Sequence, residues 1–521
     1  MYAAAGVVVL VDPASIHDEG LLSLGGSWAL GEAFLPVLFF QKIRPVASLF
    51  YLPFARLGFS SFLVAHLVVA TATVPLLAAV ARCLGIRSPN VAAAVAASSP
   101  LLVWSGPTGL ANSDGVAAIA LGLYLLLVQR WTLVAGLVLG ASCWIRYEVT
   151  PLALVLVGVA LIRDRSWRTG VGAAIWPVAY LASGAFYHGD ALWFLHFPPA
   201  LSTPMPGNET WVGSWASHDL GSAVFGLLAM SFAVPVAMLA RWSKLGIFER
   251  ALAMHAGAFC LLFVVAHLVM LPFGQLWILG LSARYVLPAL PAVAILAARA
   301  ADDLREGLAR AVHTVVLGGA ASVGAAIGFR SADPTALVSA VCAGVALVLG
   351  RLRLGRAAAI SIMIGSAVGS TILGERMRDA GFAASTDLPA LVTWLEADRA
   401  RGRRGAVITN VAQLRPYVTQ SRKLSGAEVH YVLGVDQVFE LEQLSNPNNR
   451  QREIVASALA RGVFGAGTMS PATLSPGTLE PKTLVVLRDD KRNRLTFPPE
   501  VWDSALQPIQ RIGRYVVFEV R

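Results

Sequence analysis

Apolar runs of roughly 15–22 residues recur along this chain from residue 58 to residue 374. A run of that length crosses a hydrocarbon layer of about 30 Å as an α-helix, whereas the helices of soluble proteins carry regularly spaced polar residues. The composition agrees, because 56% of the 521 residues are hydrophobic and only 14% are charged. The sequence therefore predicts a mainly α fold, a polytopic membrane helical bundle of about 12–13 spans.

The expected spans follow one another with short connections. The apolar segment at residues 2–11 is different, because as a helix it reaches about 15 Å, half a bilayer, and it lacks the pattern of a signal peptide. We expect it to be the remainder of a truncated first span. The other spans are expected at 58–81, 91–104, 115–128, 132–145, 149–162, 170–186, 220–240, 251–271, 284–299, 312–328, 335–350 and 358–374.

Basic residues are distributed unevenly between the two sets of loops. Of the 21 Lys and Arg residues between 13 and 374, 15 fall on one side and 6 on the other. Cytoplasmic loops carry the excess of positive charge, so the long segments 13–57 and 187–219 are expected outside a cell (inner) membrane. Within 13–57, the stretches LLSLGGSWAL and FLPVLFF suit helices that lie along the membrane interface. The elaborated loops on one face predict that the protein works there.

The net charge of +10 does not indicate a nucleic-acid partner. Many of the basic residues lie in short loops between apolar runs, and no aromatic residues alternate with them as in single-strand binders. The four cysteines lie far apart in or beside apolar runs and form no metal-binding or disulfide pattern. Membrane lipids are the partners that the composition indicates.

Residues 387–521 have a different character from the transmembrane domain at 1–374. Helices are predicted for two segments, DLPALVTWLEADRARG and NNRQREIVASALARG. Strands are predicted for four others, AVITNV, GAEVHYVLGV, KTLVVLRDD and RYVVFEV. We expect a small soluble α/β domain. The orientation of the spans places it outside the cytoplasm.

Three carboxylates stand out on the expected outer face. Asp18 and Glu19 begin an amphipathic segment, where they can cap the helix and complement its dipole. The alternative is a functional carboxylate, a general base or metal ligand at the membrane surface. Asp114 follows a loop rich in Gly and Pro and has the same two interpretations, a helix N-cap or a site residue.

Basic residues also occur at the outer ends of the expected spans. Arg146 and Glu148 lie in WIRYEV, where they can form an internal ion pair, or Arg146 can bind a phosphate with its planar fork. Arg284 with Tyr285 fits either an interfacial anchor or a site. The remaining candidates, with surface charge as the ordinary interpretation, are Lys42 and Arg44.

The order of these motifs resembles a known pattern. Its elements are Asp18-Glu19, the basic-Pro element at 42–45 (KIRP, where K-P-P is frequent), the basic loop ARCLGIR, Ser99-Pro100, Ser113-Asp114, and Arg284, Tyr285, Pro288 and Pro291 in R-Y-x-x-P-x-x-P. The pattern resembles the GT-C superfamily of integral-membrane glycosyltransferases, especially its bacterial protein-mannosyltransferase-like and aminoarabinose-transferase-like branch. The resemblance covers about residues 15–165, with a further match near 284–291.

The resemblance implies an inverting transfer of a sugar from a polyprenyl-phosphate donor to a protein, lipid or glycan acceptor of the cell envelope. Asp18 would act as general base beside Glu19, and cationic residues would hold the leaving phosphate. No obligatory metal is expected, although Mg²⁺ or Mn²⁺ held partly by substrate oxygens stays open. The substrate-binding residues implied or selected in this way are Lys42, Arg44, Asp114, Arg146, Glu148, Trp193, His196, Arg284 and Tyr285.

Two other functions compete with this interpretation. A transporter or lipid flippase predicts repeated halves and charged residues at mid-membrane in paired broken helices, and the sequence has neither pattern. A non-enzymatic membrane scaffold predicts that the basic C-terminal segment recruits a partner while Asp18 is dispensable.

Overall fold

The computed structural model describes most of the first half of the chain and parts of the second. The described residues form two compact units, and α5 and α11 each contribute to both. One unit runs through His66–Ala182 and continues in the described residues from 242 to 306; the other takes the helices before His66, the end of α11 and the C-terminal sheet. The described ranges are 18–39, 44–99, 111–193, 242–256, 287–306, 387–402, 405–409, 428–432, 479–488, 505–513 and 515–521, with isolated positions between them.

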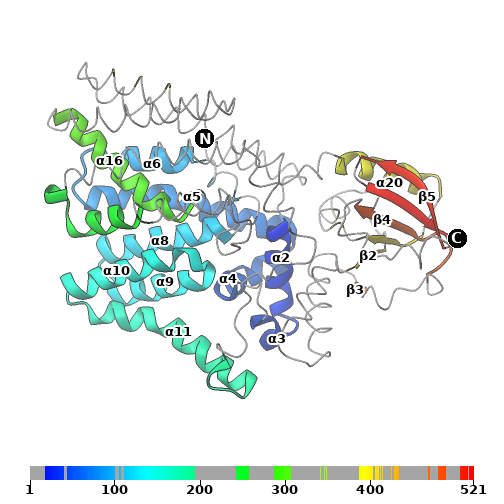
Figure 1. Ribbon diagram of the computed structural model, residues 1–521, viewed down its shortest axis with the longest axis horizontal. Helices are drawn as coiled ribbons and strands as arrows, with labels where there is room; N and C mark the ends of the chain where they lie inside the picture. The colour runs from blue at the N-terminus through cyan, green and yellow to red at the C-terminus, as the bar shows by residue number, and fades with distance from the viewer. Residues whose placement is uncertain are drawn as a thin grey trace, which may run out of the picture. The chain divides into compact units, whose positions relative to one another are not determined.

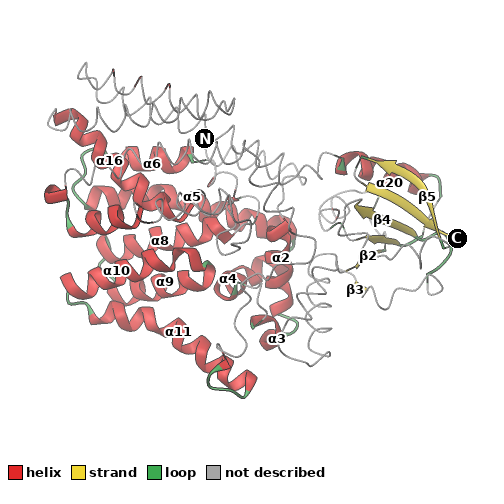
Figure 2. Ribbon diagram, viewed as in Figure 1, coloured by secondary structure: helices red, strands yellow, loops and turns green. Residues whose placement is uncertain are grey.

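Helices build the first unit (Figures 1 and 2), and several coincide with the expected spans. The span predicted at 132–145 is α9 with the same bounds, and the span predicted at 91–104 begins in α6, which ends at Ser98. Helix 247–256 begins the span expected at 251–271. The spans expected at 220–240, 312–328 and 358–374 lie outside the described residues. The helices are α5 (Phe59–Cys83), α6 (Pro89–Ser98), α8 (Ala111–Leu127), α9 (Thr132–Ile145), α10 (Thr150–Arg163), α11 (Trp167–His188) and α16 (Leu290–Glu306).

Two of the described helices are long and apolar enough to cross a membrane, Ser60–Cys83 in α5 and Trp167–His188. Shorter apolar helices include α8, α9, α10 and the segment Leu287–Arg299. The described part of the chain thus agrees in position with the predicted spans, while their full number stays a prediction.

Glycines bring α9 and α11 into backbone contact. A Cβ atom on Gly136 would lie 2.1 Å from the carbonyl oxygen of Thr169, and one on Gly140 would lie 2.3 Å from that of Ala173. From the other side, a Cβ atom on Gly172 would lie 2.2 Å from the carbonyl oxygen of Leu133. Small residues four apart on one helix allow this approach, which gains dispersion contacts where no hydrophobic effect drives association.

Helices α5 and α8 run side by side in the same direction. Near their C-terminal ends, Cys83 Sγ donates a hydrogen bond to the Leu127 carbonyl oxygen at 3.3 Å. Towards their N-terminal ends, the His66 ring faces Asp114. The two contacts fix the register of the pair and so decide which polar residues meet at each end of the bundle.

The second unit includes three short helices in the loop predicted at 13–57: α2 (Asp18–Leu30), α3 (Phe34–Leu38) and α4 (Pro45–Arg56). Helix α2 packs against α4. The expectation that LLSLGGSWAL lies along the membrane interface is wrong for the described side chains of α2, because Leu24, Ser27 and Leu30 are all buried. An interfacial helix would expose one face, whereas from Leu24 to Leu30 every residue is buried except Trp28, which is half-buried.

The C-terminal segment forms a six-stranded sheet in the order β3-β2-β1-β4-β6-β5. Strands β3, β2, β1 and β4 are parallel, and β6 joins antiparallel to β4 and β5. The predicted strands are confirmed, whereas β3 and β5 were not predicted. The elements are β1 (Val407–Thr409), β2 (Val429–Val432), β3 (Thr468–Met469), β4 (Leu484–Arg488), β5 (Leu506–Ile512), β6 (Tyr515–Val520) and the predicted helix α20 (Leu388–Ala400).

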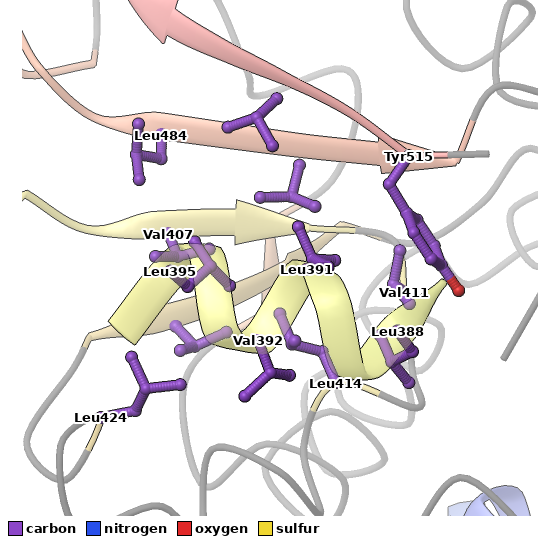
Figure 3. Packing of buried hydrophobic residues seen from close by; sticks show 13 residues of the cluster. Leu388, Leu391, Val392, Leu395, Val407, Val411, Leu414, Leu424, Leu484 and Tyr515 are labelled. Carbon is purple, nitrogen blue, oxygen red and sulfur yellow. The ribbon is translucent and has the colours of Figure 1, made fainter. Parts of the chain in front are cut away.

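Alternate residues of this sheet are buried on opposite faces. Val407 and Leu484 pack with α20 residues such as Leu391 (Figure 3), whereas Ile408 and Val485 pack on the other face. Burial on both faces is typical of parallel strands and explains why these strands have little polar alternation. The helix predicted at 448–462 lies outside the described residues.

Candidate active site

The acidic pair lies at the start of α2, since Asp18 is the first residue of that helix and Glu19 follows it. Their position in the first turn agrees with the predicted helix start, where carboxylates are favourable. Their side chains are outside the described ones. Their assignment as base and neighbour therefore stays a prediction.

The basic-Pro element leads into α4. Arg44 is the N-cap residue of that helix, and Pro45 is at its first position, where a missing N–H costs nothing. Lys42 lies outside the described residues, as do His196, Arg284 and Tyr285. The structure thus shows the local role of the proline and leaves the phosphate-binding role of these residues as a prediction.

Asp114 lies inside the first turn of α8. It is the fourth residue of a helix that begins at Ala111, so the N-cap interpretation is wrong. Only 3% of Asp114 is exposed, and its Oδ1 lies 3.2 Å from Nδ1 of His66, a fully buried residue of α5. The helix register therefore turns Asp114 into the bundle.

Arg146 and Glu148 form the internal ion pair that the sequence suggested. Arg146 ends α9 in an extended conformation, and the single turn η2 (Tyr147–Val149) follows before α10. This break places both side chains on one side, where Arg146 Nε donates to Glu148 Oε2 at 3.0 Å and Nη2 donates to Oε1 at 2.5 Å. The guanidinium is 2% exposed and the Glu148 side chain 11%.

The two pairs belong to one region of the bundle. A Cβ atom on Gly115, the neighbour of Asp114, would lie 3.3 Å from Arg146 Cβ and 3.1 Å from Val149 Cγ1. The absence of a side chain at Gly115 thus lets the η2 turn pack directly on α8. We call the residues His66, Asp114, Arg146 and Glu148 the pair cluster.

His66 is the member of the pair cluster that the sequence analysis did not select. The available signal was a single ionisable residue inside the apolar run at 58–81, and such residues are functional candidates in membrane helices. Four ionisable side chains from α5, α8, the end of α9 and η2 thus gather in the bundle. Together they offer a bidentate cationic fork and carboxylates, the groups that bind phosphates and sugar hydroxyls.

Trp193 lies in an aromatic cluster of the second unit. Its ring stacks on His188 with centroids 5.2 Å apart and meets Phe39 edge to face at 5.4 Å. Phe39 also stacks on Tyr187 at 5.1 Å. Because Trp193 is only 3% exposed, the described conformation packs it against protein, and sugar stacking by Trp193 stays a prediction.

Within the described residues, no three His, Cys, Asp or Glu side chains gather as metal ligands would. That no metal is obligatory stays a prediction.

Solved structures show the same fold over nearly the whole chain. The crystal structure of ArnT from Cupriavidus metallidurans in the apo state aligns with a TM-score of 0.55 and 14% identity, covering 99% of this chain and 97% of that one. The structure of the same protein bound to undecaprenyl phosphate gives 0.54 and 16%, with the same coverage. No protein-family model and no curated protein matches the sequence. The chain therefore has the fold of ArnT, a GT-C glycosyltransferase, as the order of its sequence motifs predicted.

Proposed function

We propose that this protein is an inverting glycosyltransferase that moves a sugar from a polyprenyl-phosphate donor to an acceptor at the extracytoplasmic face of a cell membrane. The observation that carries the proposal is the ArnT fold along 99% of the chain, since one ArnT structure holds undecaprenyl phosphate. The pair cluster adds support, because it gathers a buried guanidinium and carboxylates within the bundle.

The proposed reaction is a single displacement at the anomeric carbon. The acceptor oxygen or nitrogen attacks that carbon while the bond from the carbon to the phosphate oxygen breaks, and the polyprenyl phosphate keeps the electron pair. Asp18 takes the proton of the acceptor group as general base. Arg146, with Lys42 or Arg44, stabilises the negative charge that develops on the phosphate.

The remaining predicted residues would bind substrate. Glu19 and Asp114 would orient hydroxyl groups of the sugar or acceptor. Aromatic side chains near the end of α11 would contact the sugar or the lipid. The C-terminal sheet would lie outside the cytoplasm, following the charge distribution of the loops.

The test is release of polyprenyl phosphate from a panel of polyprenyl-phosphate sugars by the purified full chain, with a membrane extract as acceptor. We expect release by the wild type and at least about a 100-fold lower rate in Asp18→Asn, the range that general bases contribute. Glu32→Gln is the matched control. Glu32 lies in the same loop and pairs with exposed Arg56 at 3.1 Å. An exposed ion pair of this kind contributes little to the free energy of unfolding.

A wild-type rate in Asp18→Asn would remove Asp18 as the base and leave the reaction class standing. If the folded wild type released nothing across the panel, the transferase proposal itself would fail, and a transporter would become the better explanation.

A further inference from the structure

The turn between α9 and α10 holds an arginine that needs an anion in every state of the protein. Arg146 is 2% exposed, and a buried guanidinium without a partner carries a large free-energy cost. In the described conformation Glu148 meets this need, with two hydrogen bonds of 3.0 and 2.5 Å that join separate guanidinium nitrogens to separate carboxylate oxygens. A ligand that accepts hydrogen bonds from these same two N–H groups must therefore replace the carboxylate.

The geometry of this pair is the one that arginine also makes with a phosphate. The planar guanidinium offers two N–H groups in a fixed fork, which match the two oxygens of a carboxylate or of a phosphate equally well. A phosphate that took the place of the carboxylate would keep both hydrogen bonds. The exchange thus conserves the contacts of Arg146 while changing the anion.

The two partners differ in their access to solvent. The Glu148 side chain is 11% exposed, whereas that of Arg146 is 2% exposed. Glu148 also belongs to a single turn of helix between α9 and α10, and Gly115 packs on the same turn without a side chain. Glu148 is therefore the partner with the greater freedom to move away, while the stem of Arg146 packs against Gly115 of α8.

From these observations we propose that Arg146 forms a subsite for the phosphate group of a lipid phosphate, and that Glu148 occupies this subsite until the lipid binds. The inference rests on the proposed function and adds to it, because it assigns Glu148 as an internal competitor of the donor and product phosphate. The competing explanation is a permanent Arg146–Glu148 pair that only fixes the turn.

The two explanations predict opposite effects of removing the negative charge. With Glu148→Gln, Arg146 loses a charged competitor, so a phosphate binds more tightly if Glu148 is displaced on binding. If the pair is permanent, the same change only loosens the turn and leaves affinity unchanged or lower. A gain of affinity is a result that simple destabilisation does not produce.

The experiment measures the affinity of undecaprenyl phosphate for the full chain in lipid nanodiscs. We expect Glu148→Gln to bind about tenfold more tightly than the wild type, the size of a hydrogen-bonded contact to a charged group. Arg146→Gln should lose binding. The matched control is Asp164→Asn, because Asp164 pairs at 3.6 Å with its exposed neighbour Arg163 at the C-terminal end of α10. Its affinity should equal that of the wild type.

Two further measurements, one on a second variant and one with a competing anion, can also refute the inference. Glu148→Asp retains the charge on a shorter side chain and should fall between wild type and Glu148→Gln, which gives an answer even if the latter does not fold. Inorganic phosphate at matched concentrations should displace the lipid poorly; equal competition would assign the subsite to free phosphate and overturn the lipid assignment.

The outcomes separate the inference from the proposed function. If the wild type does not bind undecaprenyl phosphate, the proposed function and the subsite inference are both refuted. If the wild type binds it and the folded Glu148 variants bind no more tightly, the inference alone falls, and the pair is structural.

Discussion

Two polar regions of the same bundle use their charges in different ways. The pair cluster joins side chains to side chains, Arg146 to Glu148 and His66 to Asp114. A second region combines a side-chain ion pair, Arg299 with Glu249, with hydrogen bonds from charged side chains to the backbone of turns. Its residues, which we call the turn cluster, are Leu84, Arg87, Gly246, Glu249, Arg299 and Asp302.

The contacts of the turn cluster involve two connections of the bundle, the turn between α5 and α6 and the turn before helix 247–256. Glu249 accepts Nε–H of Arg299 at 2.7 Å and the N–H of Gly246 at 2.8 Å. Arg299 also donates to the Leu84 carbonyl oxygen at 3.2 Å, and Asp302 accepts the Arg87 N–H at 2.5 Å. These side chains satisfy backbone groups at helix ends, which is a structural role.

Helix α5 separates the two regions, because the eighteen residues from His66 to Cys83, its last residue, correspond to about 27 Å of helix. The loop charges of the sequence predict that the pair cluster lies towards the outer face and the turn cluster towards the inner face. The difference teaches that burial of charge alone does not mark a site. Charged side chains that bind backbone groups of turns hold the fold, even where they also pair with each other as Arg299 and Glu249 do. The Arg146–Glu148 pair is instead the one that we expect to exchange a partner for a ligand.

The largest effect that would distinguish the two regions is a loss of stability, and we expect it in the turn cluster. Glu249→Leu leaves Arg299 without its carboxylate and Gly246 without its acceptor, so the free energy of unfolding should fall by about 3–5 kcal/mol. Thermal unfolding in detergent measures the loss. The affinity of the remaining folded protein for undecaprenyl phosphate should be unchanged, and a specific loss of affinity would contradict the structural role.

The next effect is expected in the pair cluster. Arg146→Lys keeps the charge and loses the bidentate fork, so undecaprenyl phosphate should bind about tenfold to 100-fold more weakly with a small change in unfolding temperature. Binding in nanodiscs measures it. Arg299→Lys is the matched variant in the turn cluster, and it should lower stability without changing affinity. Equal affinity losses in both variants would remove the distinction between the regions.

Much of the helical architecture could be predicted from the sequence, because apolar runs and their charged ends determine it locally. Helix α9 has the predicted bounds, as its apolar run ends at Arg146. The strands β1 and β4 were predicted from apolar runs. Strand β5 was missed because most of its residues are exposed or half-buried and Pro508 interrupts it, so neither alternation nor a continuous apolar run marks it.

The candidate site could be predicted only residue by residue. Arg146 and Glu148 were suggested as a pair because they are two positions apart, but the partner of Asp114 is 48 residues away on α5. Helix packing selects His66, and no local pattern encodes that register. The contact of Gly115 with the η2 turn is likewise tertiary, since the sequence shows a glycine without showing what approaches it.

That contact provides a third, smaller effect. Gly115→Ala adds a Cβ atom 3.1 Å from Val149 Cγ1, so the η2 turn must shift and the Arg146 subsite should lose about fivefold in affinity, the cost of mild overpacking. The binding assay measures this loss. Gly158→Ala in α10 is the control, because its Cβ atom meets nothing within 4 Å. Unchanged affinity in Gly115→Ala would mean that the subsite tolerates movement of the turn.

The smallest effect tests whether the turn cluster depends on charge at all. Asp302 accepts the backbone N–H of Arg87, and an asparagine oxygen can accept the same hydrogen bond. Asp302→Asn should therefore cost no more than about 1 kcal/mol of unfolding free energy, whereas Asp302→Leu leaves that N–H without its acceptor and should cost about 1–3 kcal/mol. Thermal unfolding of the two variants measures both losses of unfolding free energy. If Asp302→Asn cost as much as Asp302→Leu, the negative charge itself would matter, and the turn cluster would resemble the pair cluster more closely than its backbone contacts indicate.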